Sequence, residues 1–297
     1  MNVKLFIAIL IALGIGGLVA WAGSDGGMTT HELAGSGAGA IPIFLICGIL
    51  AFVINWLAFI PANIAKTEKY YDLTGSLTYL TLMVVACVLS APLDLRSAII
   101  AMMVSIWAVR LGSFLFLRIR DDGGDQRFDE IKKSPSRFFF TWTLQGLWVL
   151  LTAASALVII TNQTKLPLGP FAFVGFALWI TGFAIEVIAD RQKRTFRKDP
   201  ANKGRFISSG LWAWSRHPNY FGEILLWAGV TVVSLPVLSG WQWATIISPL
   251  FVAVLIIRLS GVPKLEAQAD KKWGDDPDYI AYRSNTPVVM LKPPSRV

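Results

Sequence analysis

The sequence predicts an all-α, polytopic membrane protein with about eight membrane-spanning helices, or seven if the first is a cleaved signal peptide. Hydrophobic residues occupy 54% of the 297 positions and charged residues only 15%, whereas soluble domains carry about 25% charged residues. Several stretches are apolar over the roughly 20 residues that a helix needs to cross the hydrocarbon core. Twelve Trp and 18 Phe support the same class, because aromatic rings gather where lipid meets water.

The expected helices follow one another along the whole chain. They fall near residues 3–22, 40–62, 75–95, 97–117, 138–161, 168–189, 219–238 and 241–260. The first has two interpretations, because Lys4, an apolar run and the Ala-Trp-Ala at 20–22 suit either a signal peptide or a retained anchor. We therefore predict an N-terminal anchor or signal-like helix with an extracytoplasmic loop over 1–40, and one transmembrane domain over 41–297.

Basic residues are concentrated in alternate loops. Most Lys and Arg residues lie in 118–137, in 190–216 and in the tail after residue 260, whereas loops such as 162–167 are nearly neutral. With eight spans, the three basic segments fall on one side, which the positive-inside rule identifies as the cytoplasm. We therefore expect both termini in the cytoplasm.

Four charged residues are expected inside spans or near their ends: Arg110, Glu186, Asp190 and Glu223. A charge at a helix centre costs about 2.5–3.5 kcal/mol on insertion scales, so such residues usually pair or face a polar cavity. Ion pairs between helices or snorkelling would explain each residue singly. Their shared position in the cytoplasmic half favours a common polar cavity.

Polar residues are densest after residue 190. The run from Asp190 continues the sixth expected helix beyond the membrane and stops at Pro200. Lys193 and Arg197 are four positions apart, so both positive groups emerge from one face of this helix.

The next helix is expected to begin at Pro218, whose missing N–H is tolerated in a first turn. Its N-terminus would attract an anion through free N–H groups and a partial positive charge, with Arg216 and His217 at the entrance. The neighbouring side chains that suit a flat ring, a ribose or an amide are Trp212, Trp214, Asn219, Tyr220 and Glu223. The pattern indicates a site for a phosphate-bearing, ring-containing ligand; the alternative is a basic cytoplasmic loop with an aromatic belt.

Two segments, QKRTFRKDP at 192–200 and GLWAWSRHPNYFGE at 210–223, resemble the carboxy-terminal domain of membrane steroid 5α-reductases and sterol C=C reductases. The likeness is strongest to bacterial relatives that are often grouped as a domain of unknown function. Further similar segments lie at 66–80, 107–119 and 124–131, so the resemblance runs from about residue 50 to the end. It implies a multi-pass protein of a bacterial inner membrane.

The resemblance implies NADPH as cofactor, bound by a cytoplasm-facing part spanning 186–297. It further implies reduction of a C=C bond in a lipophilic substrate, such as an enone or a sterol- or isoprenoid-like molecule. The implied cofactor-binding residues are Arg110, Lys193, Arg197, Trp212, Arg216, His217, Asn219, Tyr220, Glu223, Glu266, Trp273, Tyr279 and Tyr282. Steroid 5α-reductases also use a Gln-Glu pair and a Tyr; this chain has no Gln-Glu dipeptide, and Trp107 replaces the Tyr, so the resemblance does not imply a steroid substrate.

Candidate proton donors lie in 66–72 (KTEKYYD), which enters the third expected helix from the cofactor side. Hydride addition to an enone requires an acid that polarises its oxygen. We expect Glu68 with Tyr70 or Tyr71 in this catalytic role. The alternative is an exposed, ion-paired turn with tyrosines anchored at the lipid headgroups.

The segment 118–133 mixes both charge signs around a Gly pair at 123–124. A solvated loop is one interpretation. The other is a lid in which Arg118, Asp125 and Arg127 close over the cofactor, because paired glycines permit such movement.

Two further functions fit the same pattern. Membrane methyltransferases of the isoprenylcysteine carboxyl type share an Arg-His-Pro-x-Tyr turn and bind S-adenosylmethionine, and a non-catalytic lipid-binding protein could retain the pocket. The basic pair at Lys193 and Arg197 favours NADPH, whose phosphates need cationic partners that S-adenosylmethionine does not. We expect membrane lipids and a lipophilic substrate as partners, and no nucleic acid. We also expect no metal, because Cys47 and Cys87 lie in apolar runs and only two His are present.

Overall fold

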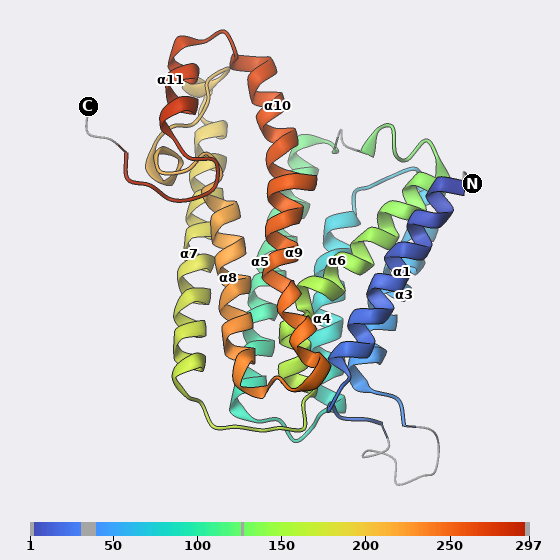
Figure 1. Cartoon of the computed structure of the whole chain (residues 1–297). Helices are drawn as coiled ribbons and strands as arrows, with labels where there is room; N and C mark the ends of the chain where they lie inside the picture. The colour runs from blue at the N-terminus through green and yellow to red at the C-terminus, as the bar shows by residue number, and fades with distance from the viewer. Residues whose placement is uncertain (1–2, 31–39, 126–127, 295–297) are drawn as a thin grey trace. The chain divides into compact units, whose positions relative to one another are not determined.

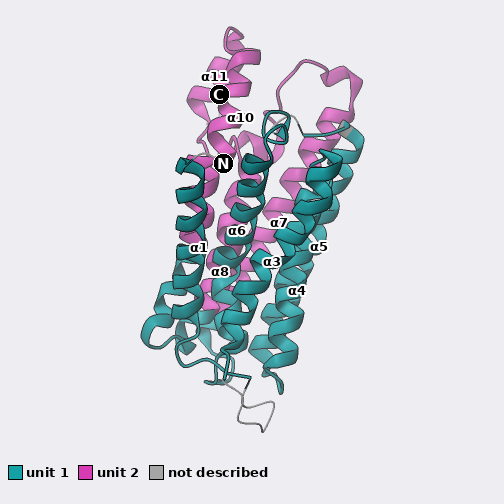
Figure 2. Ribbon diagram, turned by 90° about the vertical axis from the view of Figure 1, so that its right-hand side faces the viewer, with its two compact units in different colours: residues 1–172, 234–248 teal, residues 173–233, 249–297 magenta. Residues whose placement is uncertain are grey.

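The computed structural model describes residues 3–30, 40–125 and 128–294 (Figure 1). Within these ranges the chain is helical, with isolated β-bridges as its only strand-like pairing. Eight of the described helical segments are long and apolar enough to cross a membrane. The predicted class, an all-α polytopic membrane protein, is confirmed. The chain divides into two compact units, one of residues 1–172 and 234–248, the other of residues 173–233 and 249–297 (Figure 2).

Unit 1 is organised around one central helix, α6 (Pro135–Thr161). Within its most apolar window, 89% of the residues are buried. Four of the helices that contact it are α1 (Val3–Gly23), α3 (Ile43–Ala65), α4 (Tyr71–Leu89) and α5 (Leu95–Asp122). Small residues around Ala153 keep α6 narrow enough for neighbours on several sides.

The loops at one end of unit 1 are joined by polar bonds. Asn162 donates from Nδ2 to the Val237 carbonyl at 2.7 Å and to Gln242 Oε1 at 2.8 Å. The backbone N–H of Trp241 donates to Asp25 Oδ2 at 2.6 Å. These are nearly neutral loops of the sequence, and amide, carbonyl and carboxylate groups join them.

One helix boundary differs clearly from expectation. The third span was predicted at 75–95, but α4 ends at Leu89. Pro92 cannot donate a helical N–H, and the Asp94 side chain caps the next helix by accepting from the Ser97 N–H at 3.3 Å. The hydropathy window therefore ran past a proline turn and into the first residue of α5.

Unit 2 contains α7 (Pro170–Lys198) from residue 173 and α8 (Pro218–Ser234) up to residue 233, followed after residue 248 by the remainder of α9 (Ile247–Val254). A π-helix (Leu255–Leu259), α10 (Gly261–Trp273) and α11 (Pro277–Asn285) complete it. As expected, α7 extends past the apolar span and ends just before Pro200, and α8 begins at Pro218.

Glycines hold α7 and α8 close together in antiparallel orientation. A Cβ atom on Gly182 would lie 2.6 Å from the Gly222 carbonyl oxygen, and one on Gly175 would lie 2.5 Å from the Gly229 carbonyl oxygen. Larger residues would push the helices apart, as at other small-residue contacts between membrane helices. This contact sets the basic end of α7 beside the N-terminus of α8.

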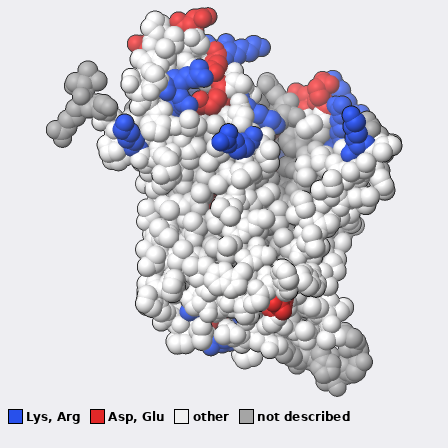
Figure 3. Space-filling model, in the orientation of Figure 1, with Lys and Arg blue, Asp and Glu red and all other residues white. Residues whose placement is uncertain are grey.

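Charged side chains are unevenly distributed along the helices. On the face drawn in Figure 3 they gather near helix ends, including the end formed by α10 and α11, and the helix sides carry almost none. On α7, large apolar side chains such as Phe173 and Ile180 are 63% and 61% exposed. An exposed apolar helix side of this kind suits contact with lipid.

Candidate functional site

The end of α7 is clamped to the turn that follows it. The Trp212 indole N–H donates to the Ala189 carbonyl at 3.0 Å, and the Leu211 N–H donates to Gln192 Oε1 at 3.0 Å. Lys193 Nζ lies 4.4 Å from the centre of the Trp212 ring, a cation–π contact. The 3-10 turn η3 (Gly210–Ala213) is therefore fixed against the basic helix end.

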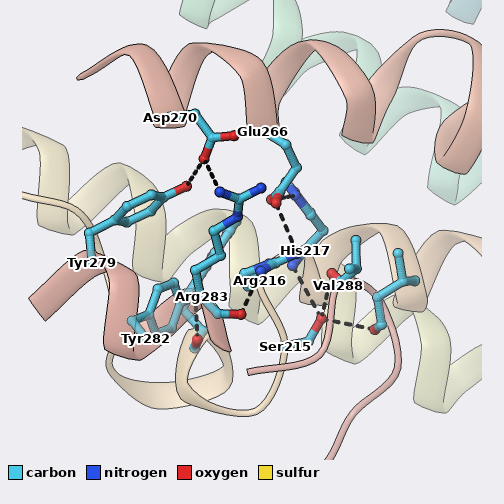
Figure 4. Close-up of polar contacts among 11 residues, drawn as sticks. Ser215, Arg216, His217, Glu266, Asp270, Tyr279, Tyr282, Arg283 and Val288 are labelled. Atoms are coloured by element: carbon cyan, nitrogen blue, oxygen red, sulfur yellow. Dashed lines mark hydrogen bonds and ion pairs between the residues drawn. The ribbon is translucent and has the colours of Figure 1, made fainter. Parts of the chain in front are cut away.

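A single carboxylate holds the Arg216-His217 turn (Figure 4). Arg216 Nη2 lies 2.9 Å from Glu266 Oε2, and His217 Nε2 lies 2.8 Å from Glu266 Oε1. Ser215 lies fully buried beneath this turn, accepting from the His217 N–H at 3.1 Å and donating to the Val289 carbonyl at 2.9 Å. Both oxygens of Glu266, on α10, are thus used to orient the turn.

A second carboxylate connects α11 to α10. Arg283 Nη1 lies 3.0 Å from Asp270 Oδ1, and the Tyr279 hydroxyl donates to the same oxygen at 3.3 Å. Arg216 Nη1 donates to the Arg283 carbonyl at 2.7 Å, so the two groups are continuous (Figure 4). Glu266 and Asp270 are four residues apart and share one helix face.

Two buried polar atoms of the turn have no partner within the described part of the chain: Nε of Arg216 and Nδ1 of His217. Burial lowers the pKa of His217 despite the nearby Glu266 carboxylate. The neutral ring therefore donates from Nε2 to Glu266, which leaves Nδ1 as an acceptor. Unsatisfied buried polar atoms are costly, and a ligand that offers both an acceptor and a donor would satisfy this pair.

Three predicted aromatic residues surround Phe206. The ring centre of Phe206 lies 5.3 Å from that of Tyr279, 5.4 Å from that of Tyr282 and 6.0 Å from that of Trp273. Burial is the main reason that the pKa of both tyrosine hydroxyls is raised, so they remain neutral donors. Tyr282 donates to the Trp212 carbonyl at 2.7 Å, which ties α11 to the clamped turn.

The acidic residues predicted near the ends of the spans lie at the α7–α8 contact. Glu186 and Asp190 are buried, and Asn219 donates from Nδ2 to Asp190 Oδ1 at 3.2 Å. The Tyr220 ring stacks on His217 at 5.5 Å between centres. Glu223 is half-buried one turn after Asn219.

In unit 1, Glu68 is buried and fully engaged. Its Oε1 accepts from the Asp125 N–H at 3.0 Å, and its Oε2 lies 2.8 Å from Lys132 Nζ. Burial favours a raised pKa, but these two bonds outweigh it and hold the pKa of Glu68 below its usual range. An ion pair does form here, but with Lys132 and below the surface, not within an exposed 66–72 turn.

The neighbouring tyrosines differ from each other. The Tyr71 hydroxyl donates to the Thr141 carbonyl at 3.0 Å, and its ring packs on Phe128 and Trp142. Tyr70 is 51% exposed and stacks beside Phe116. Of the two residues, Tyr70 is the more exposed.

The predicted lid falls partly outside the described residues, since Arg127 is not among them. Arg118 lies 4.0 Å from Asp72, and Glu68 holds the backbone at Asp125. The guanidinium of Arg110, on α5, lies 5.3 Å from the Phe114 ring centre.

The predicted cofactor residues of the carboxy-terminal third belong to unit 2, with Arg197 exposed at the end of α7. Arg110 and the 68–71 group belong to unit 1, and their functional roles remain predictions. The residues that sequence reasoning missed are Gln192, Phe206, Ser215, Asp270 and Arg283. Of these, only Asp270 could have been found from the sequence, because it lies four residues after Glu266 and therefore on the same helix face.

A family model described as "Protein of unknown function (DUF1295)" matches residues 58–286. Human 3-oxo-5-alpha-steroid 4-dehydrogenase 1 is 35% identical over 65 residues, 22% of this chain and 25% of the relative. The Delta(14)-sterol reductase of Arabidopsis thaliana is 28% identical over 97 residues, 29% of this chain and 23% of the relative.

The probable O-methyltransferase ustE of Ustilaginoidea virens is 30% identical over 102 residues, 34% of this chain and 36% of the relative. The chain therefore matches little more than a third, at most, of the length of each of these three relatives. No solved structure matches the chain significantly. Because the family model covers most of its length, the protein belongs to the DUF1295 family, which is homologous to membrane steroid and sterol reductases.

Proposed function

We propose that this protein is an NADPH-dependent membrane oxidoreductase that reduces a C=C bond in a lipophilic substrate, such as an enone or a sterol- or isoprenoid-like lipid. The observation that carries the proposal is the buried, unpartnered Nε of Arg216, a cationic donor in the same unit as the basic end of α7. Distant similarity to a steroid dehydrogenase and a sterol reductase supports the same reaction class.

The residues of unit 2 fit a phosphate-bearing nucleotide. Lys193 and Arg197 share a helix face and supply positive charge for phosphates, and Arg216 adds a guanidinium that Glu266 orients. The Nδ1 acceptor of His217 suits an amide or hydroxyl donor. Trp212, Asn219, Tyr220 and Glu223 complete the proposed binding set, with Trp273, Tyr279 and Tyr282 supporting it through Phe206.

NADPH, when bound, supplies a hydride; the protein must orient the reactants and deliver a proton. We propose Tyr70 or Tyr71 as the proton donor to the substrate oxygen. Glu68 is held ionised by Lys132, so within this proposed catalytic group it would position the tyrosines without donating. Arg110 is proposed as an additional cationic contact to the cofactor.

We further propose that the cofactor site faces the cytoplasm of a bacterial cell, because the basic segments alternate with nearly neutral loops. In this orientation, the cofactor is drawn from the cytosolic pool and the substrate from the bilayer. The lid formed by Arg118, Asp125 and Arg127 remains part of the proposal.

A second candidate is an S-adenosylmethionine-dependent methyltransferase. The match to the probable O-methyltransferase covers 34% of this chain, a larger share than the human steroid dehydrogenase or the plant sterol reductase covers. In that case, the basic face of α7 would have no phosphate to bind. A non-catalytic lipid-binding protein would retain neither cofactor.

Titration of the detergent-purified protein with NADPH, NADH and S-adenosylmethionine separates these candidates. We expect NADPH to bind, with affinity reduced roughly tenfold or more in Lys193→Ala and in Arg197→Ala, the loss of one charge-assisted contact. Lys198→Ala is the matched control, because it removes the same charge from the same exposed helix end but from another face. Binding of S-adenosylmethionine without a response to NADPH would overturn the reductase proposal.

A further inference from the structure

A groove in unit 2 is lined in part by the segment whose carbonyls bond to the Arg216-His217 turn. Its volume is about 440 Å³, and it is lined by Ile257 and Arg258 of the π-helix, Val262 of α10 and the segment 287–290. Among its described lining residues, Arg258 is the only polar side chain. A π-turn of this kind often marks a functional position in a helix.

Arg258 is an unusual residue for its position. It lies within the last apolar span, Gly240–Trp273, and its side chain is exposed. Throughout the described ranges, no carboxylate pairs with it and no acceptor bonds to it. Arg in an apolar span that has no protein partner usually reaches lipid phosphates by snorkelling.

The open side of the groove has the composition of a membrane interface. Met290, which lines the groove, is 66% exposed, and Leu259, the chain neighbour of Arg258, is 65% exposed. Trp214 is 40% exposed, and its carbonyl accepts from the N–H of Lys292, two residues after the groove segment, at 3.0 Å. Exposed aromatic and aliphatic side chains next to Lys and Arg are typical of the headgroup level of a bilayer.

We propose that this groove binds one anionic phospholipid. The acyl chain lies on Ile257, Val262 and the 288–289 wall, and the headgroup phosphate pairs with Arg258. Charge complementarity selects an anionic lipid, and the apolar lining selects a lipid over free phosphate, which would gain nothing from these side chains.

The bound lipid would also stabilise the neighbouring turn. The groove wall accepts hydrogen bonds from that turn: the Arg216 N–H donates to the Pro287 carbonyl at 2.9 Å, and Ser215 Oγ donates to the Val289 carbonyl at 2.9 Å. A lipid that orders residues 287–290 therefore favours the arrangement in which Arg216 meets Glu266. This inference does not depend on the reductase proposal, because the groove and its Arg would bind lipid whatever the turn holds.

The test is native mass spectrometry of the full chain in detergent with added phosphatidylglycerol or phosphatidylcholine of identical acyl chains. We expect phosphatidylglycerol to be retained roughly tenfold better than phosphatidylcholine, and Arg258→Ala to remove this preference. Lys271→Ala, which removes another exposed charge in the same unit, is the control and should behave as wild type. Equal unfolding temperatures of both variants in lipid-free detergent exclude a folding defect.

A second variant tests the apolar part. Val288 lines the groove and is 37% exposed, so Val288→Trp fills the space without disturbing a buried position, and it should weaken both lipids. Retention of phosphatidylglycerol by Arg258→Ala would overturn the proposal. So would equal competition by glycerophosphoglycerol, which has no acyl chains, or a dimer that Val288→Trp dissociates, since the occupant would then be a second copy. A parallel NADPH titration reports separately on the proposed enzyme.

Discussion

Two carboxylates with similar partners serve the two units differently. Glu68 in unit 1 and Glu266 in unit 2 each receive one cation and one further donor. Around Glu68, the partners are Lys132 and a backbone N–H, and neither residue of the ion pair has a buried atom without a partner in the described ranges. Around Glu266, both partners, Arg216 and His217, retain a buried nitrogen with no partner there.

This difference indicates that one carboxylate fixes a loop and that the other prepares atoms for a ligand. A buried ion pair whose members are satisfied fixes the chain but offers nothing to a ligand. A carboxylate that orients donors and acceptors without saturating them prepares those atoms for a further partner. Glu266 is therefore assigned a positioning role for the proposed cofactor, and Glu68 a role in holding the loop that follows α5.

The largest effect is expected for Arg216→Ala. It leaves the Glu266 carboxylate with only His217 as partner in a largely buried network, at a cost of about 3 kcal/mol in the free energy of unfolding. It also removes the unpartnered Nε, so NADPH binding should be lost. Thermal unfolding and NADPH titration measure the two consequences separately.

Arg216→Lys is the matched control, because it retains the charge but not the planar fork or Nε. We expect it to recover much of the stability but to bind NADPH weakly. If Arg216→Lys bound NADPH as tightly as wild type, the unpartnered nitrogen would have no part in cofactor binding.

A smaller effect on stability is expected for Glu68→Gln. The side chain is 5% exposed, and losing its charge weakens the bond to Lys132, so the free energy of unfolding should fall by about 1–3 kcal/mol. NADPH affinity should be unchanged, in contrast to the Arg216 variants. Lys132→Met should cause a similar loss, and the double variant should lose less than the sum of both.

A fall in NADPH affinity in Glu68→Gln, with its stability intact, would reverse the roles assigned to the two carboxylates. NADPH titration and thermal unfolding of Glu68→Gln therefore test whether Glu266, and not Glu68, orients the cofactor-binding residues. A loss of substrate reduction with unchanged NADPH affinity would instead agree with the proposed positioning of the tyrosines.

The sequence predicted the spans far better than the contacts around Glu266. Hydropathy is a local property, so eight spans could be found within windows of about 20 residues. The clamp by Gln192 and the packing around Phe206 depend on segments that meet only after folding. His217 and Glu266 are 49 residues apart, and no local pattern indicates that one carboxylate would bind both His217 and Arg216. The preference of proline for the first turn of a helix is also a local property, and it correctly predicted that α8 begins at Pro218.

Phenylalanine variants of Tyr70 and Tyr71 test which of these two tyrosines of unit 1 donates the proton. Tyr71→Phe removes one hydrogen bond to the Thr141 carbonyl, so the free energy of unfolding should fall by about 1 kcal/mol. Tyr70→Phe should leave stability unchanged, because Tyr70 is half-exposed and its ring contact with Phe116 is retained. Enone reduction by both variants, measured at saturating NADPH, identifies the donor: a tyrosine whose removal leaves reduction intact is not the donor.

The smallest expected effect is a pH dependence of stability. It arises from His217, the partner of Glu266, and not from the Glu68 ion pair. Burial lowers the pKa of His217 below its ordinary value of about 6.5, so folding favours the neutral ring. Its contribution to stability is complete above pH of about 6.5 and is lost as the pH falls through the lowered folded-state value. The unfolding temperature of the wild type should therefore decrease between neutral pH and pH of about 5.5, before most carboxylates titrate.

His217→Gln supplies the control, because glutamine still offers an amide N–H to Glu266 but does not titrate. Its unfolding temperature should be lower at neutral pH and nearly flat over the same range. The Glu68 pair should contribute no slope there, since its carboxylate has a lowered pKa and stays ionised over this range. Equal slopes in wild type and His217→Gln would show that folding does not shift the pKa of His217. A wild type that instead gains stability relative to His217→Gln as the pH falls would show that the folded ring is charged, and Nδ1 would then be a donor to the ligand instead of an acceptor.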